Sequence, residues 1–299
     1  MFKDYRVAEH DFRIILPDDR DFRPLLVQYE PFEAGTVTQA LFILEMVDSL
    51  DAEAVEMLYR DEAPDEGQTG IEIYRTAEGS VLACIAPARG EAPKARVLFS
   101  PDYCSARFCC SDEDFLFALN NALMLQFAFA TAPLRTLELH ASVIVNGGRA
   151  YLFLGPSGSG KSTHSRLWIK NIEGSELLND DNPLLRIMDD GSVRIYGSPW
   201  SGKFPCYRNL SFPAAAFVRI KQAPANRAVR LGILESYATL YSSVSGLKND
   251  RAMASNLHRS LEKTVLEVPC FNMECLPDDD AARVCAAAVR DNVRGSGNE

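Results

Sequence analysis

Short runs of alternating hydrophobic and polar residues, separated by turn residues, occupy about the first 110 positions of this 299-residue chain. Phe12, Ile14 and Leu16 recur at every second position, which is the period of a half-buried strand. Later runs flank Glu78-Gly79 and Ser100-Pro101-Asp102, and this arrangement predicts two hairpins. The pattern is typical of a mostly antiparallel β-sheet.

A helical pattern follows this β-rich part of the chain. It begins after Ser111, a favourable N-cap residue, and runs to about Thr131, before Pro133. The composition changes at this point. We therefore expect a β-rich N-terminal domain that ends in a helix, over residues 1–132, and a second domain over residues 133–299.

The most apolar part of this helix, residues 115–132, is too short and too polar to span a bilayer. It carries three amide side chains, those of Asn120, Asn121 and Gln126. We expect it to be a buried helix and expect no membrane partner. The first residues also lack the apolar segment of a signal peptide, so a cytoplasmic location is expected.

The second part of the chain alternates strand and helix patterns, which is typical of an α/β fold. A strand over residues 136–145 turns at 146–148 into the apolar strand 151–154, which we expect to pair with it. Further strands are expected at residues 176–179, 183–188, 193–196, 212–220 and 265–275. Helices are expected at residues 164–172, 231–244, 250–263 and 278–293.

The segment Gly155-Pro-Ser-Gly-Ser-Gly-Lys-Ser162 joins the strand at 151–154 to the helix after it. It fits the phosphate-binding loop pattern at every fixed position. Its glycines allow backbone N–H groups to point at phosphate oxygens, and the helix start adds positive charge there. We expect Lys161 to neutralise the β- and γ-phosphates and the Ser162 hydroxyl to bind Mg²⁺; the alternative is a glycine-rich turn that matches by chance. The residues expected to contact a nucleoside triphosphate are Gly155, Ser157, Gly158, Ser159, Gly160, Lys161, Ser162 and Thr163.

Two adjacent carboxylates end the predicted strand at 176–179. In a phosphoryl-transfer enzyme, one carboxylate at such a strand end holds Mg²⁺ and a second accepts the proton of an attacking hydroxyl. We assign these tasks to Asp180 and Asp181, against the alternative of a solvated turn. His140 lies beside the strand that feeds the loop, and either reaches the γ-phosphate or the substrate or is a hydrogen-bonded core residue.

A glycine-bearing loop, Gly197-Ser-Pro-Trp-Ser-Gly-Lys203, supplies a cation further along the chain. Such a loop can close over a transferring phosphate and stabilise the negative charge of its transition state. Lys203 is therefore a candidate catalytic and substrate-binding residue, and Arg208 a candidate substrate-binding residue. The alternative is a surface turn with a solvated lysine.

The charge and the cysteines exclude some functions. A formal charge of −10 with no basic block predicts no nucleic-acid partner. The eight cysteines include no C-x-x-C pair and no zinc-finger spacing, and reduced thiols are the better interpretation.

These motifs, in this order, resemble the catalytic domain of HPr serine kinases, which is similar in fold to phosphoenolpyruvate carboxykinase. The resemblance covers about residues 135–285 and rests on His140-Ala-Ser, the loop at 155–162 and Leu178-Asn-Asp-Asp181. It implies a mixed-sheet P-loop catalytic domain and a possible homo-oligomer. The implied roles are phosphate contact for Lys161, Mg²⁺ binding for Ser162, metal and general-base work shared by Asp180 and Asp181, and a place in the site for His140.

The chain also departs from that family. No Glu-x-Arg-Gly segment stands between Asp181 and Gly197, and Thr163 replaces a glutamate that commonly follows the loop serine. The resemblance therefore names neither HPr as the substrate nor a reverse phosphorylase activity. The sequence predicts a kinase-like protein that uses ATP and Mg²⁺ to phosphorylate a hydroxyl of a protein, peptide or small molecule. A carboxykinase-like enzyme and a nucleotide-sensing or assembly protein are the alternatives.

Overall fold

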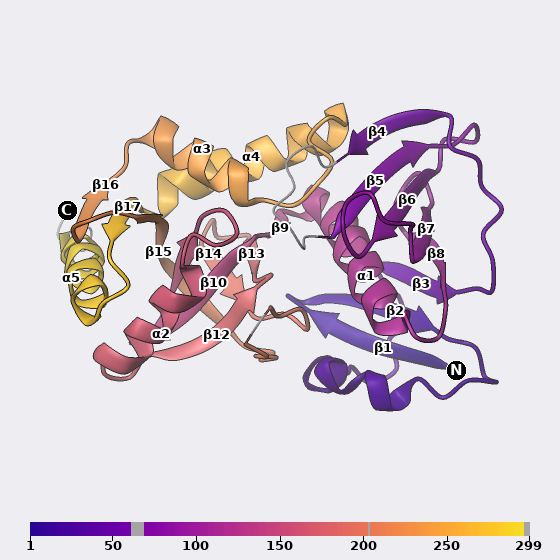
Figure 1. Ribbon diagram of the computed structural model, residues 1–299, viewed down its shortest axis with the longest axis horizontal. Coiled ribbons are helices and arrows are strands. Elements are labelled where there is room, and N and C mark those ends of the chain that lie inside the picture. The colour runs from indigo at the N-terminus through magenta and orange to yellow at the C-terminus, as the bar shows by residue number, and fades with distance from the viewer. Residues whose placement is uncertain (61–68, 203, 296–299) are drawn as a thin grey trace. The chain divides into compact units, whose positions relative to one another are not determined.

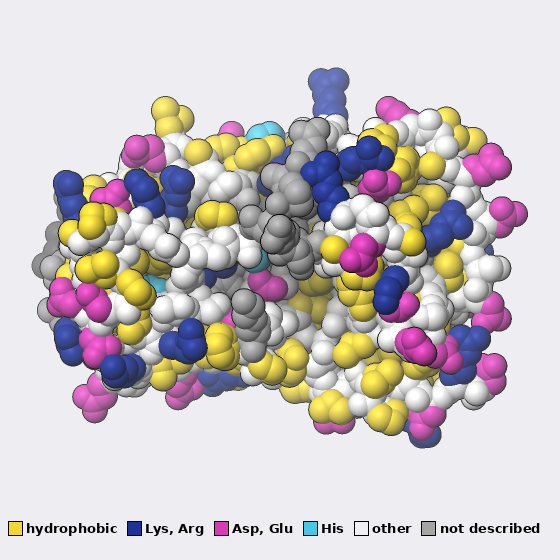
Figure 2. Space-filling model, in the orientation of Figure 1, with side chains coloured by type: hydrophobic (Ala, Val, Ile, Leu, Met, Phe, Trp, Pro, Cys, Tyr) yellow, Lys and Arg dark blue, Asp and Glu magenta, His cyan; other side chains and the backbone are white. Residues whose placement is uncertain are grey.

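The computed structural model describes residues 1–60, 69–202 and 204–295, with side chains described up to residue 290. The chain divides into two compact units. The first comprises Met1–Leu134 and Gly246–Asn256, and the second comprises Arg135–Ser245 and the chain from Leu257 onward. Charged side chains of both signs are scattered among hydrophobic and uncharged residues on the face shown in Figure 2.

An eight-stranded sheet forms the first unit, in the order β1-β2-β3-β8-β7-β6-β5-β4 (Figure 1). In the described residues, five neighbouring pairs are antiparallel, whereas β2/β3 and β3/β8 are parallel. Both predicted hairpins are present, as β5/β6 and β7/β8. The strands are β1 (Phe2–Val7), β2 (His10–Ile15), β3 (Phe42–Met46), β4 (Glu56–Arg60), β5 (Gly70–Arg75), β6 (Val81–Ala86), β7 (Ala95–Phe99) and β8 (Ser105–Cys110).

The parallel β2/β3 pair has a long connection because a two-residue turn cannot join parallel strands. This connection contains the 3₁₀ turns η1 (Arg23–Leu25) and η2 (Val27–Phe32). The sequence pattern predicted the two strands but did not indicate their relative direction.

Helix α1 (Phe115–Thr131) packs on this sheet, and the 3₁₀ turn η3 (Ala132–Leu134) follows it. Phe12 and Phe42 stack with their ring centroids 4.9 Å apart, and both meet Phe127 of α1 edge-on. Among the described residues, Phe115–Leu134 has the length and composition of a membrane span, but 67% of its apolar window is buried inside the protein. This burial is that of the core helix of a soluble protein.

The start of α1 differs from the prediction. The helix begins at Phe115, not directly after Ser111. Asp114 donates its N–H to the carbonyl and the hydroxyl of Ser111, so the acidic residues 112–114 form a separate turn before the helix. Ser111 caps that turn.

The second unit is built on a mixed sheet in the order β12-β10-β11-β15-β14-β13-β9, with β17 paired to β15 and β16 paired to β17 (Figure 1). The β11/β15 and β15/β17 pairs are parallel. The predicted β10/β11 hairpin is present, and β13 and β14 also pair as a hairpin. The strands are β9 (Thr136–Glu138), β10 (Ala141–Asn146), β11 (Arg149–Leu154), β12 (Glu176–Asp181), β13 (Leu184–Ile187), β14 (Val193–Tyr196), β15 (Ser211–Gln222), β16 (Arg227–Arg230) and β17 (Cys270–Cys275).

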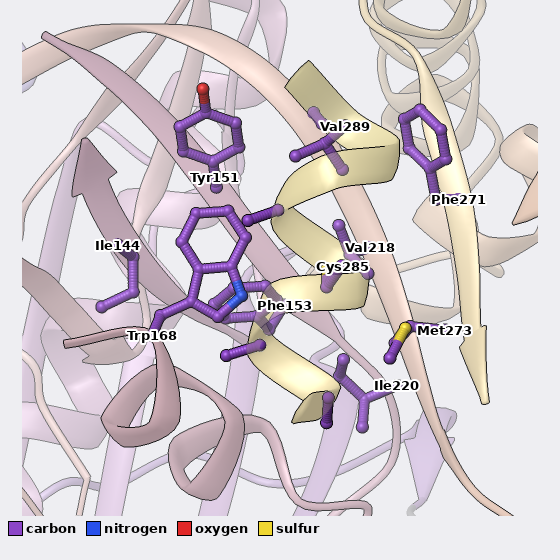
Figure 3. Close-up of a cluster of buried hydrophobic side chains, with 14 of the residues drawn as sticks. Ile144, Tyr151, Phe153, Trp168, Val218, Ile220, Phe271, Met273, Cys285 and Val289 are labelled. Carbon is purple, nitrogen blue, oxygen red and sulfur yellow. The ribbon is translucent and has the colours of Figure 1, made fainter. Parts of the chain in front are cut away.

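Helices α2 (Lys161–Asn171) and α5 (Asp279–Gly295) pack against each other and cover a continuous core on this sheet. Trp168 of α2, Phe153 of β11 and Cys285 of α5 are fully buried there (Figure 3). Burying a large apolar side chain contributes about 1.5–3 kcal/mol, so this core fixes the position of α2 against β11. Helices α3 (Ile233–Ser243) and α4 (Arg251–Glu267) complete the described elements.

Two element boundaries differ from the prediction. The strand predicted over residues 136–145 is broken into β9 and β10, because the N–H of His140 donates to Ser243 O and not to a neighbouring strand. The strand predicted from Val265 begins at Cys270, because α4 continues to Glu267. Its β-branched residues favour a strand locally, but the hydrogen bond from Val268 N–H to Thr264 O continues the helical pattern.

Candidate functional site

At one edge of the sheet in the second unit, β10 begins and its two neighbours, β11 and β12, end. Ala141, the first residue of β10, pairs with Leu154 at the end of β11 and with Asp181 at the end of β12. His140 precedes Ala141, and Gly155 follows Leu154. The register of the sheet therefore brings together the loop, the histidine and the aspartate pair, which lie far apart in the sequence.

The loop between β11 and α2 has the backbone that its glycines predict. Gly155, Gly158 and Gly160 have φ values of 143°, 75° and 103°, in the region that favours glycine. Helix α2 begins directly after Gly160, and the amide of Gln222, the last residue of β15, donates to Gly158 O. The loop is thus tied to the sheet at the start of a helix, where backbone N–H groups favour an anion.

We expect Gly155→Ala to destabilise the fold by about 2 kcal/mol or more, from a positive φ together with a steric clash. A Cβ at Gly155 would lie 2.6 Å from Ser159 Oγ and 3.2 Å from Ile220 O. Gly148→Ala is the control, because Gly148 has a φ of 72° but no atom within 4 Å of the added Cβ. Urea denaturation measures both, and equal losses in the two variants would contradict a packing role for Gly155.

Lys161 lies at the mouth of this loop and is only 8% exposed. Its ammonium donates to Gly155 O at 2.9 Å and Pro156 O at 3.2 Å, and its Nζ lies 2.8 Å from His140 Nε2. A lysine ammonium has donors but no acceptor, so His140 Nε2 accepts and the ring proton is on Nδ1. His140 thus links the loop lysine to the carboxylate at the end of β12.

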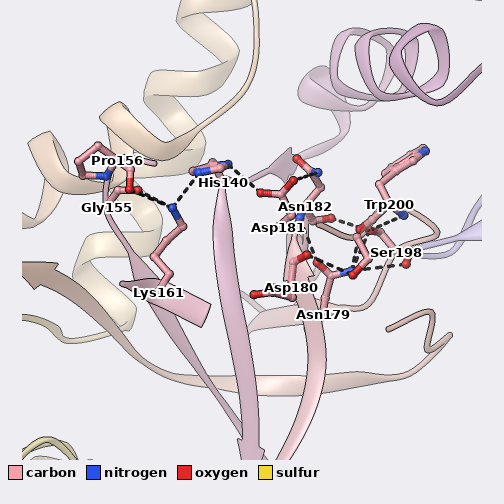
Figure 4. Close-up of polar contacts among 11 residues, drawn as sticks. His140, Gly155, Pro156, Lys161, Asn179, Asp180, Asp181, Asn182, Ser198 and Trp200 are labelled. Carbon is pink, nitrogen blue, oxygen red and sulfur yellow. Dashed lines mark hydrogen bonds and ion pairs between the residues drawn. The ribbon is translucent and has the colours of Figure 1, made fainter. Parts of the chain in front are cut away.

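Asp181 completes a chain of contacts that starts at Lys161 (Figure 4). His140 Nδ1 lies 3.1 Å from Asp181 Oδ1, and the side-chain amide of Asn182 donates to Asp181 Oδ2 at 3.2 Å. Both oxygens are held, while the side chain remains 37% exposed. Asp181 also has a φ of 131°, which is rare for a residue with a side chain and is found mostly at functional sites.

Asp180 points to the opposite side of β12. It pairs with Ser142, whose hydroxyl lies 2.6 Å from Ser165 Oγ on α2, and paired residues of an antiparallel ladder share a face. Asp180 therefore faces α2, on which Ser162 precedes Ser165 by three residues and lies on the same side. The Asp180 side chain is 3% exposed.

The donor set of Ser162 and Asp180 suits Mg²⁺. The Asp180 carboxylate is buried, and a bound cation would offset the cost of burying its charge. Within the described residues, no group of three or more His, Cys, Asp or Glu is arranged to hold a metal. Two protein ligands are nevertheless sufficient for Mg²⁺, which usually keeps several waters and binds phosphate oxygens.

Residues 197–202 of the predicted loop lie against the end of β12. The buried Asn179 amide donates to Ser198 O, Ser198 Oγ and Trp200 O, and Ser201 forms a bridge with Asp181 (Figure 4). Sequence reasoning missed this role of Asn179, although the residue precedes the aspartate pair. Lys203, the candidate cation of this loop, lies outside the described residues.

Arg208 does not lie at the sheet edge that holds His140, Gly155 and Asp181. Its guanidinium donates to Leu177 O at 2.8 Å and pairs with Glu176 at 3.0 Å. Both partners lie in the first part of β12, whereas Asp181 is its last residue. Arg208 follows Lys203 closely in the sequence. Its guanidinium nevertheless lies near the start of β12, whereas Asp181 is at the end of β12.

Two further charged residues lie close to the predicted site residues and were not predicted. Arg166 of α2 donates to Thr163 Oγ1 at 3.4 Å and lies over the ring of Phe204, 4.6 Å from its centroid. Glu138 of β9 is buried, and burial, with a smaller contribution from the charge of Asp181, raises its pKa to about 8. A signal for Glu138 was present in the sequence, since an acidic residue stands between Leu137 and Leu139 in an apolar strand.

Comparisons with solved structures find distant structural neighbours. Among solved structures, the chain is similar to the Hpr(Ser) kinase/phosphatase from Coxiella burnetii, at 12% sequence identity and a TM-score of 0.33. The match covers 54% of this chain and 93% of that protein. No family model and no curated protein matches the sequence. A function for this chain therefore has to be argued from its own site.

Proposed function

We propose that the second unit is an ATP-dependent phosphotransferase domain that, with Mg²⁺, transfers the γ-phosphate to a hydroxyl of a protein, peptide or small molecule. One observation carries the proposal. The lysine of the glycine loop is connected through His140 to a partly exposed carboxylate at a neighbouring strand end. This arrangement combines a phosphate-binding cation with a candidate base.

Phosphate binding is assigned to the loop and Lys161. The carbonyls of Gly155 and Pro156 hold the ammonium at the loop mouth, so little side-chain entropy is lost when it contacts the β- and γ-phosphates. The start of α2 contributes backbone N–H groups to the same place. Lys161 would stabilise the charge on the transferring phosphoryl group.

Mg²⁺ would be held by Ser162 and Asp180, and would supply neutralisation of charge on the β- and γ-phosphate oxygens. Asp180 is then occupied with the metal. Asp181, which points to the other side of the strand, remains available to the acceptor. The two adjacent carboxylates thus have separate tasks because successive residues of a strand face opposite ways.

Proton transfer is assigned to Asp181. The acceptor hydroxyl would give its proton to this carboxylate as its oxygen attacks the γ-phosphorus. The bond between the γ-phosphorus and the β–γ bridging oxygen would break, and ADP would leave. His140 and Asn182 orient the two carboxylate oxygens, and the exposed part of the side chain is accessible to an acceptor. His140 is therefore assigned as a positioning residue.

The direct test is ATP consumption by the full chain with Mg²⁺, with and without pools of cell metabolites and peptides. Mass spectrometry of the products would identify a phosphorylated hydroxyl, which is the expected result. Tight ATP binding with no phosphorylated product from any pool would contradict the proposal and would favour a nucleotide-sensing protein.

We expect Lys161→Ala to weaken ATP binding about tenfold or more, because a charge-assisted contact to phosphate is lost. Lys170→Ala is the matched control, since Lys170 lies on the same helix but is exposed and pairs with Asp279. Calorimetric titration with ATP and Mg²⁺ measures both variants. An unchanged affinity in Lys161→Ala would remove the basis for assigning the loop to phosphate.

A further inference from the structure

A solvent-open cavity of about 710 Å³ lies in the second unit, between helix α3 and the strands β15, β16 and β17. Its volume is within the range of small-molecule sites, which is about 300–1,000 Å³. It does not contain any residue of the loop at 155–160, nor His140 or the aspartate pair.

The sheet side of the cavity is cationic. Arg219 and Lys221 alternate along β15 with Ile220, which lies in the hydrophobic core, so the two cations point to the face away from that core. In the register of the sheet, Asn272 of β17 lies opposite Arg219, and Glu274 of β17 lies opposite both Lys221 and Arg227. Three cationic side chains from two strands are thus brought to one face.

The residues of α3 that line the cavity are small or polar. Glu235, Ala238, Thr239 and Ser242 recur at the spacing of one helical face, and all four line the cavity. A helix that packs closely on a sheet normally presents large apolar residues to it. Here small and hydroxyl-bearing residues face arginine and lysine, so a polar cavity replaces a packed interface.

The acidic residues of the lining form no ion pair with Arg219 or Arg227. Glu274 pairs with Lys221 at 3.2 Å, and Glu235 accepts the N–H of Gly232 at the start of α3. Among the described residues, no carboxylate lies within ion-pair distance of Arg219 or Arg227. The chain as a whole has a formal charge of −10, so this local positive charge does not follow from the composition.

We infer that this cavity is a ligand site for a polyanionic small molecule. Phosphate or carboxylate groups would pair with Arg219 and Arg227, because a guanidinium offers two parallel donors to either group. Asn272 and Thr239 would donate to or accept from neutral polar atoms of the same ligand. The site does not depend on the function proposed for the loop at 155–160.

The test is a calorimetric titration of the full chain with two probes, inorganic pyrophosphate and citrate. At least one probe is expected to bind, and Arg219→Gln/Arg227→Gln is expected to weaken that binding about tenfold or more. If only pyrophosphate binds, the ligand is phosphorylated. If only citrate binds, the ligand is a polycarboxylate. If both bind, the cavity is a general polyanion site. Failure of both probes to bind at millimolar concentration overturns the inference.

Two controls separate this site from other sources of anion binding. Arg149→Gln makes the same kind of substitution, with the loss of one positive charge, at an exposed residue at the start of β11, and it is expected to leave the affinity unchanged. Lys161→Ala removes any probe binding at the loop, and the binding that remains in this variant is expected to be weakened by Arg219→Gln/Arg227→Gln. If Lys161→Ala abolishes the binding while the arginine double variant retains it, the probes bind at the loop and the inference is overturned.

Discussion

Replacing Asp181 with asparagine is expected to lower phosphoryl transfer by about 10²–10⁴-fold, the usual contribution of general acid–base catalysis. Binding of ATP with Mg²⁺ is expected to change by less than about threefold, because in our assignment Asp180 and Ser162 hold the metal. Asparagine has nearly the same shape and accepts a hydrogen bond from His140 Nδ1, but its amide cannot take up a proton at neutral pH.

The comparison requires turnover and ATP affinity for the same protein preparations. Asp189→Asn is the matched control, because Asp189 is 98% exposed in a turn of the same unit and belongs to no part of the assigned site. Wild-type turnover in Asp181→Asn would refute the general-base assignment. A loss of ATP affinity as large as the loss of turnover would instead make Asp181 a binding residue.

The loop at 155–160 could be predicted because its conformation is determined locally. Glycine is the residue that adopts positive φ without a penalty, and the three loop glycines all do so. The Asp180-Asp181 pair was predictable for a related reason. A polar pair that ends an apolar strand lies at the carboxyl end of that strand, where ligand sites of α/β sheets are commonly found.

The connection between Lys161 and Asp181 could not be read from the sequence. It depends on the register in which Ala141 pairs with both Leu154 and Asp181, and register is a property of strands that are distant along the chain. Arg208 illustrates the same limit. Its proximity to Lys203 in sequence suggested a shared site, but the return of the chain along β12 places its guanidinium at Glu176 and Leu177.

The parallel pairs in the first unit show a second limit. Alternation of hydrophobic and polar residues predicts a strand and its buried face, but contains no information on direction. Hairpins such as β7/β8 were predictable because a short turn permits only antiparallel neighbours. The long connection before β3 permits either direction, and the strand pairs in parallel with both β2 and β8.

The sequence does not indicate how deeply Glu138 is buried or how far its pKa is raised. It is 3% exposed, and its Oε2 atom is buried without a hydrogen-bond partner. Burial raises its pKa from 4.5 to about 8; the nearby Asp181 adds to this increase, and a hydrogen bond with Ser245 opposes it. At neutral pH the carboxyl is therefore protonated, and it does not repel the Asp181 carboxylate.

Glu138→Gln is expected to raise the free energy of unfolding at pH 8 by several kcal/mol. In the wild type, the unfolded chain ionises Glu138 above about pH 4.5, while the folded protein keeps the proton up to about pH 8. Ionisation therefore favours the unfolded chain, and wild-type stability falls as pH rises from about 4.5 to 8. Each unit of pKa difference corresponds to about 1.4 kcal/mol, and glutamine removes this dependence because it does not titrate.

Urea denaturation at pH 5, 6.5 and 8 distinguishes this effect from a change in packing. The two proteins should differ little at pH 5, and the advantage of Glu138→Gln should grow with each step. Glu173→Gln, the same change at an exposed position, should follow the wild type throughout. A Glu138→Gln variant less stable than the wild type at pH 8 would mean that the folded protein holds an ionised, well-paired Glu138. Two negative charges would then lie near each other at the end of β12, and the assignment of Asp181 as the base would need an additional cation beside it.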